Sequence, residues 1–139
     1  MLSLTIDQLL DSLGVRLARD DTGAVASHLV PNPLPEPGTI YAVTSETEGV
    51  PVQGHGFQQR QRLVLVMLYG APPTAAGKRQ LDLLLAHLKA RAGEVDRHPT
   101  LRLRQGGASP ADTMPTRFDR DTRTHYAGQR FALTYVHAT

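Results

Sequence analysis

The chain contains no cysteine and no tryptophan in 139 residues, and aromatic residues make up only 5% of it. The absence of cysteine excludes disulfide bonds and thiolate metal sites. No apolar run approaches the ~20 residues of a membrane-spanning helix, and no segment has the form of a signal peptide. We therefore expect a soluble protein, made in a cytoplasm and long enough to fold as one domain around its own core.

Lysine is also scarce, since thirteen arginines and two lysines supply all the basic residues. The net charge of +2 hides an asymmetry: residues 1–59 sum to −5 and residues 60–139 to +7. A basic half is found in some nucleic-acid-binding proteins, but here the arginines are scattered and no predicted helix carries a basic stripe. The alternatives are an ordinary solvated surface and contacts between oppositely charged halves of neighbouring copies.

The strongest structural signals lie between Gln58 and Arg104. A polar start followed by the apolar run 63–69 predicts a long strand that is covered on both faces only toward its end. Leucines at 81, 84, 85 and 88 then follow the spacing of one helix face, which predicts a helix from Thr74 to about Gly93. Both elements point to a well-packed core.

A shorter helix is predicted at the N-terminus, where Thr5 and Gln8 form a capping-box pattern and Gly14 provides a stop. Alternating or apolar segments predict further strands at 39–44, 98–104 and 126–136, and a hairpin from 15–18 and 24–30. The order of elements indicates an α+β fold in a single domain, residues 1–139. We expect an antiparallel or mixed β-sheet of about four to five strands with two helices packed on it.

Proline and glycine mark the segments between these elements. Four alternating prolines make residues 31–38 an extended surface connector rather than a link between domains. Glycine and proline without periodicity predict mobile loops at 45–56 and 105–125.

One segment imitates a nucleotide-binding phosphate loop, because a strand is followed by a turn, Gly77-Lys78 and a helix. The motif requires glycine where this chain has Pro72, and serine or threonine where it has Arg79. Pro72 and Pro73 also lack the amide donors that would hold a phosphate. The segment is therefore better interpreted as a helix entry.

Other candidate chemistry is equally weak. Asp119 and Asp121 share one face of an extended backbone, as a magnesium-binding or proton-sharing pair would. Arginines at 117, 120 and 123 interleave with them, which favours a self-neutralising hairpin edge or salt bridges between subunits. The six histidines show no ligand spacing, and Ser109 lacks the glycines of a nucleophile elbow. We predict no catalytic residue, no cofactor and no metal site.

The chain as a whole resembles the tail terminator proteins of long-tailed bacteriophages and related tail-completion proteins. The resemblance covers about residues 5–137 and lies in the order of segments: 40–43 leading to 48–51, Phe57-Gln58 entering the strand 62–69, the leucine helix, and an arginine-rich segment before 131–136. These motifs are architectural and include no catalytic signature.

The resemblance implies a virion protein that forms a ring, usually of six copies, on the end of the completed tail tube. Such a ring stops tube polymerisation and offers a surface to the neck or connector proteins of the head, without cofactor or chemistry. Another neck or tail-completion role is the alternative. Charged residues in predicted loops and at the polar end of the long strand are then the candidate contacts between subunits and at the ring faces: Glu46, Glu48, Arg60, Arg62, Arg117, Asp119, Arg120, Asp121 and Arg123.

Overall fold

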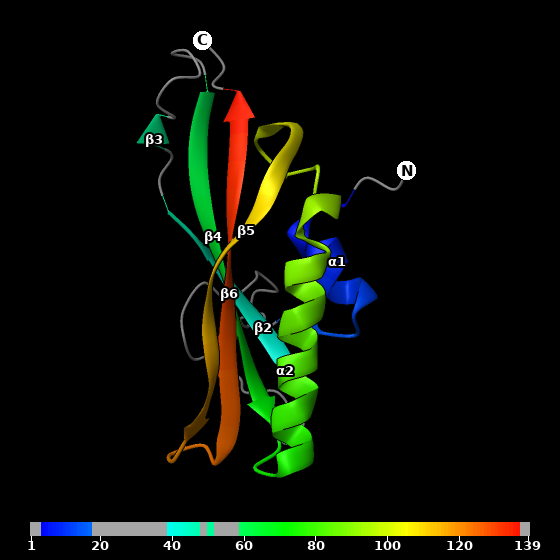
Figure 1. Ribbon diagram of the computed structural model, residues 1–139, viewed down its shortest axis with the longest axis vertical. Helices are drawn as coiled ribbons and strands as arrows, with labels where there is room; N and C mark the ends of the chain where they lie inside the picture. Colours follow the sequence, from blue (N-terminus) through cyan, green and yellow to red (C-terminus); the bar gives the residue numbers. More distant parts are fainter. Residues whose placement is uncertain (1–3, 18–38, 48–49, 52–58, 137–139) are drawn as a thin grey trace, which may run out of the picture.

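A computed structural model describes residues 4–17, 39–47, 50–51 and 59–136, and they form an α+β fold with one twisted, mixed sheet (Figure 1). The strands lie in the order β1-β2-β4-β6-β5, and the short β3 pairs with the outer part of β4. The β1–β2 pair is parallel and every other pair is antiparallel. The elements are α1 (Ile6–Ser12), β1 (Arg16–Leu17), β2 (Tyr41–Glu46), β3 (Val50–Pro51), β4 (Gln59–Ala71), α2 (Ala75–Ala90), a 3-10 turn (Ala92–Glu94), β5 (Arg102–Asp119) and β6 (Thr124–Val136).

Both predicted helices are confirmed and pack on one face of the sheet (Figure 1). In α1 the Thr5 hydroxyl accepts from the Gln8 amide at 3.1 Å, and the Gln8 side chain accepts from the Thr5 amide at 3.0 Å. In α2 the Thr74 hydroxyl accepts from the Gly77 amide at 3.0 Å. The α2 helix ends at Ala90, earlier than predicted, because the chain tightens into the 3-10 turn that contains Gly93.

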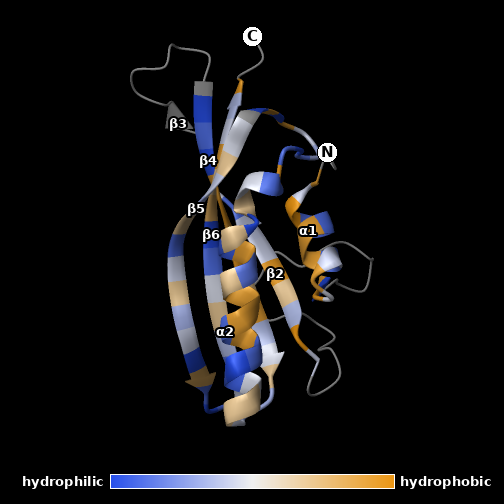
Figure 2. Ribbon diagram, turned by 45° about the vertical axis from the view of Figure 1, so that its right-hand side comes forward, coloured by the Kyte–Doolittle hydropathy of each residue, from blue (hydrophilic) through white to orange (hydrophobic). Residues whose placement is uncertain are grey.

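The core lies between the helices and the face of the sheet that they cover. Figure 2 shows hydrophobic residues concentrated along both helices, whereas the start of β4 is hydrophilic and extends past them. Phe131 and Leu133 point into this core as the alternation of β6 predicts, and Tyr135 is buried further along the same strand. The largest fully buried apolar side chains are Phe131, Leu9, Leu10, Leu68, Leu81, Leu88, Leu133, Val66 and Val95.

The prediction of a mobile loop at 105–125 is wrong, because most of it belongs to β5 and β6. Strand β5 is an edge strand, which bonds to a neighbour along one side only and so tolerates Pro110 and Pro115. Three irregularities also interrupt its alternation, between Leu103 and Ala108, between Pro110 and Thr113, and between Met114 and Arg117. The shifted register hides the period-two pattern on which strand prediction depends.

Smaller corrections concern the ends of other strands. The predicted mobile loop at 45–56 is wrong at Ser45 and Glu46, which end β2, and at β3, which pairs with Arg60 and Gln61. Strand β5 begins at Arg102 instead of residue 98, because 98–101 form a turn. Strand β1 pairs in parallel with β2. The second arm of the predicted hairpin, 24–30, lies outside the described residues, so the hairpin stays a prediction. The connector 31–38, residues 24–30 and residue Glu48 lie outside the described residues.

A buried glutamine fastens β5 to the sheet. The Gln129 side chain is fully buried on β6, and its amide nitrogen donates to the carbonyl oxygens of Arg130 at 2.9 Å and Ala111 at 3.1 Å. Its amide oxygen accepts from the Thr113 hydroxyl at 2.5 Å. The bonds to Ala111 and Thr113 reach β5 between Pro110 and Thr113, where the regular ladder is interrupted. Gln129 thus replaces backbone pairing that the bulge removes.

Candidate assembly surfaces

The candidate contact residues fall into two separate clusters on the sheet. Glu46 ends β2, and Arg60 and Arg62 lie in the first part of β4; we call these three residues the Glu46 cluster. Arg117, Asp119, Arg120, Asp121 and Arg123 lie at the tip of the β5–β6 hairpin, which we call the hairpin tip. Glu46 pairs with Val64 on β4, and Val64 pairs with Phe131 on β6, whereas the hairpin tip begins at Thr124 on β6. At ~3.3 Å per residue the two clusters are roughly 23 Å apart along β6.

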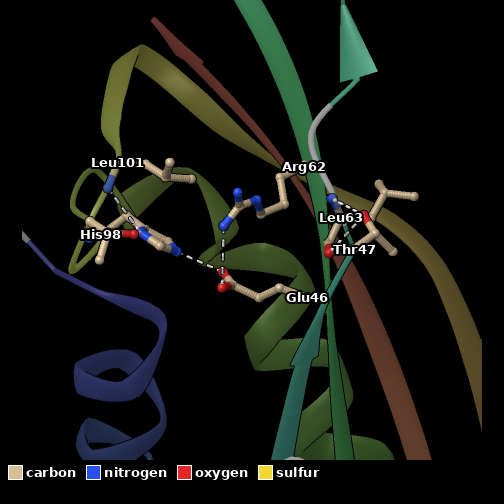
Figure 3. Close-up of polar contacts among 7 residues, drawn as sticks. Glu46, Thr47, Arg62, Leu63, His98 and Leu101 are labelled. Atoms are coloured by element: carbon tan, nitrogen blue, oxygen red, sulfur yellow. Dashed lines mark hydrogen bonds and ion pairs between the residues drawn. The ribbon is translucent and has the colours of Figure 1, made fainter. Parts of the chain in front are cut away.

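Glu46 is held by a histidine and an arginine from two other segments (Figure 3). The His98 Nε2 atom lies 2.6 Å from Glu46 Oε1, and Arg62 Nη1 lies 3.6 Å from Glu46 Oε2. The Arg62 guanidinium also lies over the Tyr135 ring, 5.7 Å from its centroid. These contacts connect β2, β4, β6 and the turn before β5.

Backbone amides of the turn that contains His98 orient its imidazole ring. Its Nδ1 atom accepts from the amides of Thr100 and Leu101, each at 3.1 Å (Figure 3). Because Nδ1 acts as an acceptor, the proton of the neutral ring lies on Nε2 and is donated to Glu46. Both ring nitrogens are therefore engaged in positioning the turn and the carboxylate. This role could not be predicted from sequence spacing, since Glu46 and His98 are 52 residues apart.

The two arginines of β4 are only partly satisfied. The Nε atoms of Arg60 and Arg62 are buried and have no hydrogen-bond partner within the described structure. A buried donor without a partner costs about 1–3 kcal/mol.

A pocket of about 300 Å³ opens beside Glu46, between the start of α1, the end of β2 and the segment 97–99. The buried side chains of Ile6, Val64 and Leu133 contribute apolar lining. Asp7, Glu46, Arg97 and His98 supply the charged and polar lining. The volume is at the lower limit for ligand pockets and suits a single side chain better than an extended ligand.

The hairpin tip is an ordered turn with exposed arginines. The Asp119 carboxylate accepts from the Asp121 amide at 2.9 Å, and Arg123 adopts a positive φ of 54°. Arg117, Arg120 and Arg123 are exposed, and none of them makes an ion pair in the described part of the chain. The hairpin itself is confirmed. Asp119 bonds to the backbone of the turn and forms no ion pair with an arginine among the described residues, so the opposite charges of this segment are neighbours without salt bridges. Arg117 and Asp119 also lie in β5, not in a loop.

Near the hairpin tip, three tyrosines form a row across β2, β4 and β6 that the sequence did not reveal. The rings of Tyr41 and Tyr69 stack with centroids 5.5 Å apart, and those of Tyr69 and Tyr126 with centroids 6.2 Å apart. Strand register alone brings these residues together, so only the pairing of strands identifies the row. Burial raises the pKa of Tyr69 above its ordinary 10.0, and the neighbouring Tyr41, Tyr126 and Asp119 add to the rise.

This shift predicts a loss of stability at alkaline pH. Because the pKa of Tyr69 is higher in the folded state, its protonated form stabilises the fold. This stabilisation is fully present below pH 10.0 and is lost as the pH rises through the folded-state pKa. Above about pH 10 we expect the free energy of unfolding of Tyr69→Phe to fall less than that of the wild type. Between about pH 7 and 9 we expect the difference in free energy of unfolding between the two proteins to stay constant. Urea unfolding across this range measures it; equal losses in both proteins above pH 10 would contradict the assignment.

Comparisons with known proteins leave the family open. A scan against protein-family models finds no match to this chain, and a search of curated proteins also finds none. No helix in the described ranges has the length and apolar character needed to cross a membrane. Among the same residues, no three or more histidine, aspartate or glutamate side chains gather as metal ligands would.

Proposed function

We propose that this protein is a structural subunit of a long-tailed bacteriophage, located at the head–tail junction of the virion. Copies of the chain form a ring that caps the tail tube, and the resemblance to tail terminators implies six copies in it. The ring ends polymerisation of the tail tube protein and offers its outer face to the neck or connector proteins of the head. The mechanism is steric and electrostatic, and it requires no cofactor.

The observation that carries this proposal is the placement of two ordered, charged surfaces at separate places on one sheet. A ring subunit needs two different surfaces, because each copy contacts one neighbour on either side. The Glu46 cluster is fixed by His98 and Arg62, and the hairpin tip by the Asp119 turn. Ordered surfaces lose little entropy on association, which favours their use as contacts.

Deletion of the gene in its phage tests this function. We expect tails of variable, excessive length and filled heads that remain unjoined, with both defects corrected when the wild-type chain is supplied. Electron microscopy measures tail length and joining directly. Tails of uniform length without heads would favour another neck role and overturn the terminator proposal, and normal particles would overturn both.

A further inference from the structure

We propose that the turn 98–101 is a pH-sensitive element, which is closed while the His98 ring is neutral and opens when the ring gains a proton. The turn leads into the start of β5, and its Pro99 lines the pocket beside Glu46. Opening of the turn therefore changes one wall of this pocket. The element lies within a single chain, so it goes beyond the proposed function and acts whether or not copies form a ring.

Both ring nitrogens of His98 are used, and the side chain is only 9% exposed. Nδ1 accepts from the amides of Thr100 and Leu101, each at 3.1 Å, and Nε2 lies 2.6 Å from Glu46 Oε1 (Figure 3). Nδ1 has a lone pair with which to accept only while it carries no proton. The closed turn therefore requires the neutral ring, with its proton on Nε2.

Protonation converts Nδ1 from an acceptor into a donor. The added N–H would face the two amide N–H groups, and both amides would lose their acceptor. The Thr100 hydroxyl lies 3.3 Å from Nδ1 and can accept the added N–H, but this leaves the two amides unpaired. Because Thr100 is exposed, amides released from the ring can bond to water once the turn moves.

The contact between His98 and Glu46 does not break when the ring is protonated. An imidazolium still donates from Nε2, and a carboxylate binds a charged donor more strongly than a neutral one. The ring therefore stays at Glu46, and the backbone of the turn moves away from it. Loss of the two amide bonds with retention of the Glu46 contact is the expected sign of this movement.

Charges of both signs lie around the ring. The charged groups that line the pocket with His98, bond to Glu46 or lie within two residues of the ring are Asp7 on α1, Glu46 on β2, Arg62 on β4, and Asp96 and Arg97 before the turn. The three carboxylates favour the imidazolium and the two guanidinium groups oppose it. What couples the charge of the ring to the turn is the pair of amide bonds to Nδ1.

Nuclear magnetic resonance of the isotope-labelled wild type tests this between about pH 8 and 5, the range in which histidine changes charge. Imidazole nitrogen shifts report the charge and tautomer of His98, and hydrogen exchange, corrected for its intrinsic dependence on pH, reports the amides. We expect protection of Thr100 and Leu101 to fall roughly fivefold to tenfold as His98 gains its proton. The Val95 amide, which donates to the Ala92 carbonyl at 3.1 Å, should keep its protection.

His98→Asn is the control that cannot titrate. The asparagine side-chain oxygen can accept from the amides two and three residues on, as in an Asx turn, so this turn should stay closed over the same pH range. Glu46→Gln separates the two titratable groups, because glutamine still accepts from Nε2 but does not ionise. We expect its turn to open together with protonation of His98, as in the wild type. Melting curves establish that both variants remain folded.

Three results would overturn the proposal: a His98 ring that stays neutral at about pH 5, a protonated ring with both amides still protected, or opening of the turn in His98→Asn. A turn that stays closed in Glu46→Gln with a protonated ring would assign the response to the carboxylate and would overturn it as well. None of these measurements depends on ring formation or tail length, so failure of the proposed function would leave their results unchanged.

Discussion

Gly70→Ala is expected to lower the free energy of unfolding by about 2–4 kcal/mol and the melting temperature by roughly 10 °C. Gly70 lies in the irregular pairing between Leu68 and Ala71, with a positive φ of 86° that L-residues rarely adopt. A Cβ atom there would also collide with the backbone carbonyl oxygen of Thr39 and lie 3.3 Å from the Tyr41 ring. A backbone oxygen beside a sheet strand cannot move away cheaply.

Gly93→Ala is the matched control for this change. Gly93 lies in the 3-10 turn after α2, its φ is not positive, and a Cβ atom there would meet nothing within 4 Å. We expect its melting temperature to equal or slightly exceed that of the wild type, because alanine restricts the unfolded chain. Thermal unfolding followed by circular dichroism measures both variants. Equal melting temperatures for the two variants would contradict the prediction, because they would mean that the backbone around Gly70 shifts to accept a Cβ atom without loss of stability.

Gln129→Leu is expected to cost about 2–4 kcal/mol, although leucine has nearly the same size. The change removes the partners of the Ala111 carbonyl and the Thr113 hydroxyl, on the bulged part of β5. We expect hydrogen exchange to accelerate around residues 111–113 more than elsewhere in the sheet, because β5 is attached there by this side chain.

Thr113→Val provides the comparison, since it removes one partner and leaves the glutamine in place. We expect a cost of about 1 kcal/mol, and a coupling in the double variant, because both changes remove the same hydrogen bond. Wild-type stability and unchanged exchange in Gln129→Leu would mean that backbone pairing alone holds β5.

The helices and β4 were predictable because their signals are local. Capping by Thr5 and Thr74 and the leucine spacing of α2 involve residues within two turns of one another. The start of β5 was predicted by the strand at 98–104, but the rest of the strand was missed. Its prolines and register shifts are acceptable only at the edge of a sheet, and edge position is a property of the whole fold.

The candidate site was predictable only in part. Charge density identified the arginines of the hairpin tip and of β4, but not their division into two clusters. The contact between Glu46 and His98 depends on the turn before β5 meeting the end of β2, and no sequence spacing encodes that meeting. The tyrosine row and Gln129 likewise depend on strand register.

Electron microscopy of tail tubes incubated with the purified protein decides whether this chain caps the tube. We expect a closed ring at one end of each tube, with no protein bound along its length. Protein bound along the tube wall, or tube ends that remain bare at saturating protein, would contradict it.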